Sequence, residues 1–97
     1  MSKAYFISTY QAVHDADALA AYAKLALPAI QAAGGQFIVR GMPAMVKEHG
    51  QMQRTVVIEF PNLDAAKAAY DSPDYKEALV ALGTNSVVRD IRIVEGV

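Results

Sequence analysis

The chain has 97 residues, which is enough for one domain spanning residues 1–97 but short enough that folding buries a smaller share of its surface than in a larger protein. Hydrophobic residues make up 54% and charged residues 20% of the chain, a composition that excludes intrinsic disorder. Nine basic residues, scattered singly, oppose ten acidic ones, which argues against a nucleic-acid partner.

The first predicted elements are a strand over Ala4–Val13 and a helix over Asp17–Ala33. The strand segment is rich in aromatic and β-branched residues, which suit a pleated, buried surface. Asp15 is placed to cap the helix, apolar residues recur at helical spacing, and Gly34-Gly35 supplies the stop signal. Pro28 lies inside this helix and predicts a local bend.

Two further strands are predicted to form an antiparallel hairpin. The first begins near Gln36, is disturbed at Gly41–Pro43 and is expected to resume over Ala44–Glu48. The second covers Gln53–Phe60 after a short connection that contains Gly50.

A second helical region and a last strand complete the chain. Asn62 is the expected N-cap of the first helical piece, and Ser72-Pro73 restarts the helix, which continues to Leu82. The last strand is predicted over Val87–Val94. The resulting order βαββαβ is typical of an α+β ferredoxin-like sandwich, with a four-stranded antiparallel sheet and both helical layers on one face.

The hairpin strands carry apolar residues on both faces. In the segment 55–60, alternation places Val56, Ile58 and Phe60 on one face but leaves Val57 on the other. Strict alternation in the segment 37–40 likewise predicts that Ile38 and Arg40 share a face. Since two helices cover only one face of a small sheet, a second copy of the chain is expected to cover the other, giving a homodimer.

The chain contains no cysteine, so it can form no disulfide. Residues 1–13 lack a basic segment leading into an apolar core, and no uncharged apolar stretch approaches ~20 residues. We therefore expect a soluble, cytoplasmic protein without a membrane partner.

Several short segments together resemble the family called domain of unknown function 1330, a branch of the dimeric α/β-barrel superfamily. The segments are Gly34-Gly35 with Arg40-Gly41, Val57–Pro61, Ala66 and Tyr70 with Ser72–Tyr75, and Val94–Gly96. The resemblance implies a homodimer whose two sheets face each other, with a pocket between sheet and helices in each subunit. Relatives often carry an arginine after the tyrosine of the second helix, where this chain has Leu82–Thr84.

Arg40 and Glu59 are the charged candidates for a ligand site, because the predicted hairpin places them on one face. Arg40 would grip an anion with its planar guanidinium, and Glu59 would orient it or act as the candidate catalytic acid or base. The alternative is a structural ion pair at the subunit junction.

Tyr22, Tyr70 and Tyr75 fall on the inward stripes of the two helical regions. Tyrosines in these positions shape a pocket for a small aromatic or acidic ligand, or they are simply core residues whose hydroxyl groups need partners.

No cofactor is expected. The two histidines, His14 and His49, lie at element ends and have no convergent ligands, so a metal site is not predicted. No Gly-x-Ser-x-Gly elbow exists, and Gly34-Gly35 follows a helix instead of preceding one, so it is not a phosphate loop. Two hypotheses remain open: a small-molecule pocket in a homodimer, with or without cofactor-independent catalysis, and a non-catalytic interaction or regulatory module.

Overall fold

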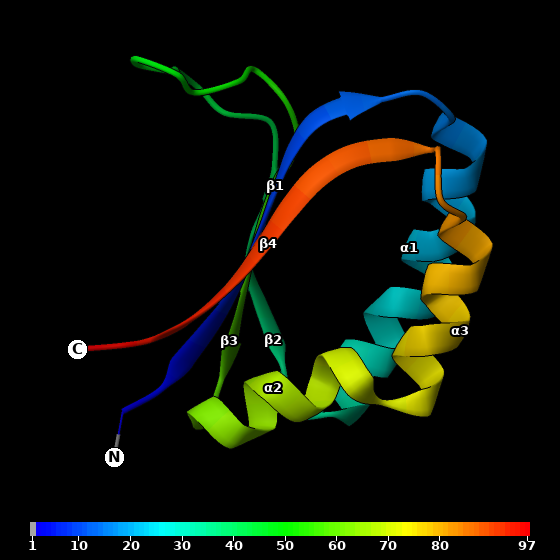
Figure 1. Ribbon diagram of the computed structural model, residues 1–97. Coiled ribbons are helices and arrows are strands. Elements are labelled where there is room, and N and C mark those ends of the chain that lie inside the picture. The colour runs from blue at the N-terminus through cyan, green and yellow to red at the C-terminus, as the bar shows by residue number, and fades with distance from the viewer. Residues whose placement is uncertain (1) are drawn as a thin grey trace.

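The chain forms one antiparallel sheet with three helices packed against one of its faces, as a computed structural model describing residues 2–97 shows (Figure 1). The elements are β1 (Ala4–Val13), α1 (Ala16–Ala32), β2 (Gln36–Gly41), β3 (Thr55–Phe60), α2 (Leu63–Asp71), α3 (Pro73–Leu82) and β4 (Val87–Glu95). The strand order is β2-β3-β1-β4, and every neighbouring pair is antiparallel. The predicted ferredoxin-like α+β fold is confirmed.

The predicted helix starts are confirmed by their capping hydrogen bonds. The Ala18 amide donates to Asp15 Oδ1 at 3.0 Å, and the Ala65 amide donates to Asn62 Oδ1 at 2.8 Å. Ser72 accepts from the Tyr75 amide at 3.3 Å and separates α2 from α3. Each cap supplies a side-chain oxygen to an amide that has no partner within the first helical turn.

Helix α1 continues through Pro28 and ends at Ala32. Gly34 and Gly35 follow it, and each is needed for a different reason. Gly34 adopts a φ of 97°, which L-residues with a side chain avoid. Gly35 is needed for space, because a Cβ there would lie 2.6 Å from Ile30 Cγ2 and 2.8 Å from Ile58 Cγ2. This close approach brings the end of α1 directly onto the sheet.

The connection between β2 and β3 is longer than predicted, and the expected resumption of the strand over Ala44–Glu48 is wrong. Residues 42–54 form a loop without a strand. Pro43 cannot donate to a sheet ladder, Glu48 has a φ of 53°, and the Gly50 amide turns back to the Lys47 carbonyl at 2.9 Å. The loop extends beyond the sheet at the top of Figure 1.

A register shift in β2 changes which residues face the helices. Phe37 pairs with Ile58 and Arg40 with Val56, whereas the pairing shifts between Phe37 and Val39. Ile58 and Val56 both face the core, so Phe37 and Arg40 lie on the helix side of the sheet. The prediction that Ile38 and Arg40 share a face is therefore wrong, because the extra residue of a β-bulge breaks the alternation.

The core lies between the sheet and the helices, and the largest fully buried side chains are Phe6, Ile30, Phe60 and Tyr75. The opposite sheet face is bare of helices (Figure 1). Val39 and Val94 remain 47% and 48% exposed. No helix within residues 2–97 is long and apolar enough to cross a membrane.

Candidate functional site

A pocket opens between the helix-facing side of the sheet and α1. Its polar lining consists of Ser8, Tyr10, Tyr22, Arg40, Arg54 and Arg89. Its volume is about 40 Å³. That is room for about three water molecules, or for one small charged group of a ligand.

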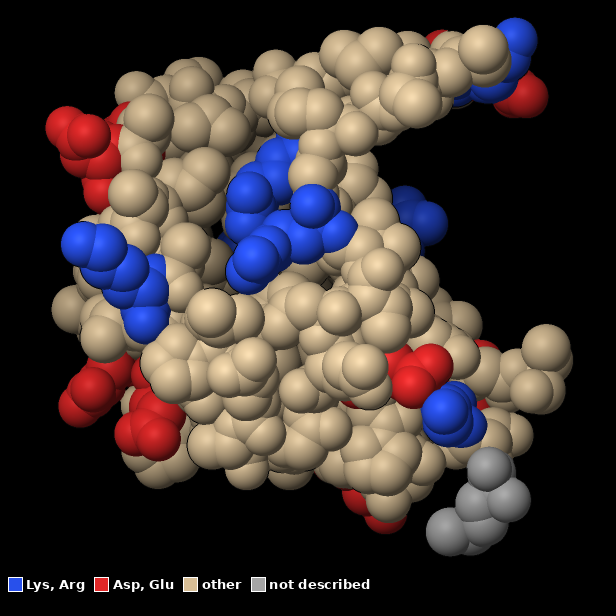
Figure 2. All heavy atoms as spheres, turned by 180° about the vertical axis from the view of Figure 1, so that it is seen from behind, with Lys and Arg blue, Asp and Glu red and all other residues tan. Residues whose placement is uncertain are grey.

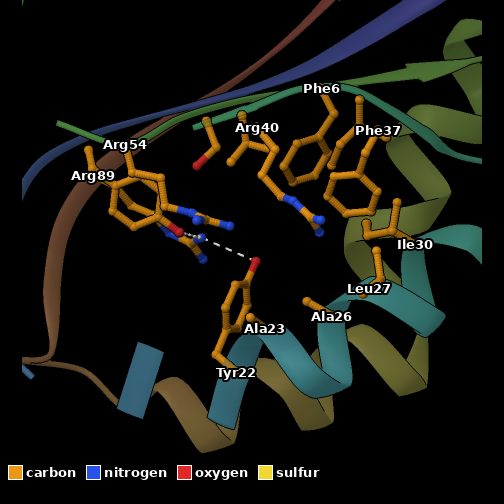
Figure 3. A pocket seen from close by; sticks show the side chains of 14 residues that line it. Phe6, Tyr22, Ala23, Ala26, Leu27, Ile30, Phe37, Arg40, Arg54 and Arg89 are labelled. Atoms are coloured by element: carbon orange, nitrogen blue, oxygen red, sulfur yellow. Dashed lines mark hydrogen bonds between the residues drawn. The ribbon is translucent and has the colours of Figure 1, made fainter. Parts of the chain in front are cut away.

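Three arginines reach this pocket from three different strands or strand ends. Arg40 comes from β2, Arg54 directly precedes β3, and Arg89 comes from β4 next to Tyr10 of β1. Figure 3 shows their guanidinium groups converging on the space above Tyr22. In Figure 2, basic side chains gather at the centre of one face, and the acidic side chains of that view lie away from this group.

No carboxylate neutralises these arginines within residues 2–97, where the ion pairs join Lys3 to Glu59 and Arg92 to Asp90. None of the pocket-lining residues is acidic. Two buried polar atoms of lining residues, Ser8 Oγ and Arg54 Nε, have no hydrogen-bond partner among residues 2–97. Buried polar groups are normally paired, so these two atoms are exceptions to the usual pattern.

Arg89 is held by two phenols. Its Nη1 donates to Tyr10 Oη at 3.0 Å and to Tyr22 Oη at 3.2 Å, and its guanidinium lies over the Tyr22 ring at 4.9 Å. Burial lowers the pKa of Arg89, but the facing oxygens of Tyr22, Tyr75 and Tyr10 outweigh it, so the pKa stands above its usual range. Arg89 is therefore a permanent positive charge in a fixed orientation.

Tyr75 lies behind this network, 1% exposed, with its hydroxyl oxygen 2.6 Å from that of Tyr22. Burial, reinforced by Tyr22, raises the pKa of the Tyr75 phenol above its ordinary value. Its hydroxyl group therefore keeps its proton at physiological pH.

The other end of the pocket is apolar. Phe6, Ile30, Phe37 and Ile58 line it, and the Arg40 guanidinium lies 5.5 Å from the centre of the Phe37 ring. Figure 3 shows Phe6 and Phe37 on the side away from Arg54 and Arg89. The lining therefore offers hydrogen-bond donors at one end and an apolar surface at the other.

The structure brings only some of the predicted site residues to the pocket. Arg40 and Tyr22 line it, whereas Tyr70 and Tyr75 pack behind it with ring centres 5.3 Å apart. The predicted contact between Arg40 and Glu59 is wrong. Glu59 lies on the bare sheet face, where Lys3 Nζ donates to its Oε1 at 3.1 Å and Tyr5 Oη to its Oε2 at 3.2 Å.

Sequence reasoning missed Arg54, Arg89, Tyr10 and Ser8. Each is an even number of residues from a core-facing position in its own strand segment: Arg54 stands two before Val56, and Ser8 two after Phe6. Period-two alternation, extended to the strand ends, was the signal that could have placed them on the helix side.

No group of three or more His, Asp and Glu residues in the described part of the chain is arranged to hold a metal ion.

Comparison with known proteins places the chain in a sequence family. The model of the family described as "Domain of unknown function (DUF1330)" matches residues 3–97. No curated protein matches the chain.

Solved structures share the fold at low sequence identity. Two crystal structures of the RPA0582 protein, from Rhodopseudomonas palustris, superpose with TM-scores of 0.75 and 0.74 at 15% identity. Each alignment covers 99% of this chain and 82% or 83% of the other. A Caulobacter crescentus CB15 protein, assigned by its name to the antibiotic biosynthesis monooxygenases, has a TM-score of 0.61 at 16% identity over 99% of this chain and 91% of that one. These likenesses show the fold.

Proposed function

Because the chain belongs to the domain of unknown function 1330 family, whose name supplies no activity, we propose from the site itself that the protein binds a small anionic metabolite between sheet and α1. One observation carries the proposal: Arg40, Arg54 and Arg89 line one pocket, and none of them has a carboxylate partner in the described part of the chain. Like charges at close range repel in the ligand-free protein. An anion in the pocket removes that repulsion.

The chemistry of the lining favours a carboxylate or a similar oxyanion. A guanidinium presents paired donors that match the two oxygens of a carboxylate. Ser8 and Arg54 both line the pocket, and the guanidinium of Arg54 adds further donors. Phe6 and Phe37 would contact the apolar part of the ligand.

The side chains that line the pocket suit ligand binding better than acid–base catalysis. Its polar side chains are arginines, tyrosines and a serine, with no carboxylate or histidine to act as a general base. Glu59, the residue considered as a catalytic acid or base, lies on the opposite sheet face. Any reaction in this pocket would have to use a tyrosine or the ligand itself for proton transfer.

The test is a thermal-shift and calorimetric titration with phosphate, propionate, pyruvate and malonate. The wild-type protein is expected to be stabilised by at least one of these anions, and Arg54→Gln is expected to lose most of that stabilisation. Lys67→Gln removes the same charge from an exposed position on α2 and should behave like the wild type. If none of the four anions gives an Arg54-dependent effect, the proposal is refuted.

We also propose that two copies associate through the bare sheet face, in keeping with a cytoplasmic homodimer. The half-exposed Val39 and Val94 on that face support this, as does the hollow of about 630 Å³ between the sheet and the 42–54 loop. A single copy leaves this apolar surface in water. Sedimentation equilibrium at low micromolar concentration should give a mass twice that of the 10.4 kDa chain. The Val94→Lys variant should give a mass closer to that of one chain.

A further inference from the structure

Tyr10 of β1 contacts two of the three arginines that line the pocket, although those two arginines are far apart in the sequence. Its backbone amide donates to the carbonyl of Arg54 at 3.1 Å. Its phenol oxygen accepts a hydrogen bond from Arg89 Nη1 at 3.0 Å, and Arg89 is also its direct cross-strand partner on β4. Tyr10 therefore lies between Arg54 and Arg89 and is bonded to both.

Two phenols share one nitrogen of Arg89. Nη1 donates to Tyr10 Oη at 3.0 Å and to Tyr22 Oη at 3.2 Å (Figure 3). This nitrogen carries two hydrogens, so the two phenol oxygens use both of them. The guanidinium carbon of Arg89 also lies 5.6 Å from the centre of the Tyr10 ring, which is buried and held by its neighbours.

The donors that Arg89 keeps for a ligand form a single pair. A guanidinium offers paired hydrogens on two edges, one formed by Nη1 with Nη2 and the other by Nε with Nη2. The first edge needs a hydrogen of Nη1, and both of those hydrogens are directed at Tyr10 and Tyr22. The edge formed by Nε and Nη2 is therefore the one that can receive the two oxygens of a carboxylate or a similar oxyanion.

We infer that Tyr10 is a positioning residue of the anion site. Its phenol, together with that of Tyr22, fixes the Arg89 guanidinium so that the edge formed by Nε and Nη2 meets the ligand. This role rests on the proposed function and assigns the donors that Arg89 contributes to it. Tyr10 does not alter the charge of the site, because an arginine stays ionised with or without the phenol. It reduces the side-chain entropy that Arg89 loses when a ligand binds.

The experiment is a double-mutant cycle with the strongest binder among phosphate, propionate, pyruvate and malonate. Calorimetry gives its Kd for the wild type, Tyr10→Phe, Arg89→Met and the double variant. Immobilising a long side chain on binding corresponds to about a 2- to 12-fold loss of affinity. Tyr10→Phe keeps the ring and removes the acceptor oxygen, so the Kd should rise by a factor in that range. In the Arg89→Met background the same substitution should change the Kd by less than about twofold, because the side chain that Tyr10 positions is gone.

Tyr5→Phe is the matched control, because it removes a phenol oxygen from the same strand on the opposite sheet face. Tyr5 Oη donates to Glu59 Oε2 at 3.2 Å there, so the Kd of this variant should equal that of the wild type. A second measurement needs no ligand. Nitrogen NMR relaxation of the Arg89 Nε–H group should show larger motion on the picosecond to nanosecond timescale in Tyr10→Phe than in the wild type or in Tyr5→Phe.

Three results would overturn the inference. An unchanged Kd in Tyr10→Phe would show that the phenol is not needed, and a lower Kd would show that the ligand competes with it for Nη1. An equal loss in the wild-type and Arg89→Met backgrounds would show that Tyr10 does not act through Arg89. Unchanged motion of Arg89 in Tyr10→Phe would show that the phenol does not hold the guanidinium. If no anion binds in an Arg54-dependent manner, the proposed function itself fails, while the relaxation comparison still decides whether Tyr10 holds Arg89.

Discussion

Arg54→Met is expected to stabilise the ligand-free protein while abolishing its anion binding. Arg54 Nε is buried and finds no hydrogen-bond partner in the described residues, and such a group costs about 1–3 kcal/mol. Because the Arg54 side chain is only partly buried, the lower end applies, about 1 kcal/mol. Methionine keeps an unbranched chain of similar course, and the lost charge also relieves repulsion from Arg40 and Arg89.

The assay is urea unfolding at fixed protein concentration in low-salt buffer without phosphate or carboxylates. The free energy of unfolding should rise by about 1 kcal/mol, equivalent to an increase of about 4–8 °C in Tm for a domain of this size. Lys67→Met removes the same charge from an exposed site and should change stability by less than about 0.5 kcal/mol.

An anion that binds in the pocket should make the wild type more stable than Arg54→Met. At a ligand concentration of 100 times Kd, the wild type gains about 2.7 kcal/mol and Arg54→Met gains nothing. A destabilisation of about 1 kcal/mol or more by Arg54→Met in the ligand-free state would refute the reasoning. Such a result would show that Arg54 stabilises the ligand-free fold and is not held there for ligand binding.

Three further results are expected. Gly35→Ala should destabilise the protein by about 1–3 kcal/mol in urea unfolding, because its Cβ would clash with Ile30 and Ile58; an unchanged midpoint would contradict the tight packing of α1 on the sheet. Glu59→Gln should leave the affinity for anions unchanged within twofold, since Glu59 lies on the other sheet face; a tenfold loss would restore it as a site residue. The affinity for an anion that is fully ionised from pH 6 to 9 should stay constant over that range. The raised pKa of Arg89 keeps the guanidinium charged, and the raised pKa of Tyr75 keeps the phenol protonated. A titration with a midpoint inside this window would reveal an ionising group that the lining lacks.

Local signals predicted the elements well. Asp15, Asn62 and Ser72 cap their helices through contacts three residues away, so their role could be derived from neighbouring sequence alone. The antiparallel four-stranded sheet with its helices on one face followed from the order of elements. Pro43 and Gly50 correctly indicated a break and a turn, but no local signal showed that the segment Ala44–Glu48 between them stays outside the sheet.

The pocket was harder to predict, because it depends on register between strands far apart in the sequence. One extra residue at the β2 bulge moved Arg40 from the side of Glu59 to the helix side. Arg54 and Arg89 are separated by more than thirty residues and meet only because β1 lies between β3 and β4. Alternation assigns each to a face, but no local pattern shows that they converge.

The most direct measurement is a crystal structure of the protein with malonate at a concentration well above its measured Kd. The account predicts one carboxylate in contact with the guanidinium groups of Arg54 and Arg89. An empty pocket beside malonate bound elsewhere on the protein would contradict it.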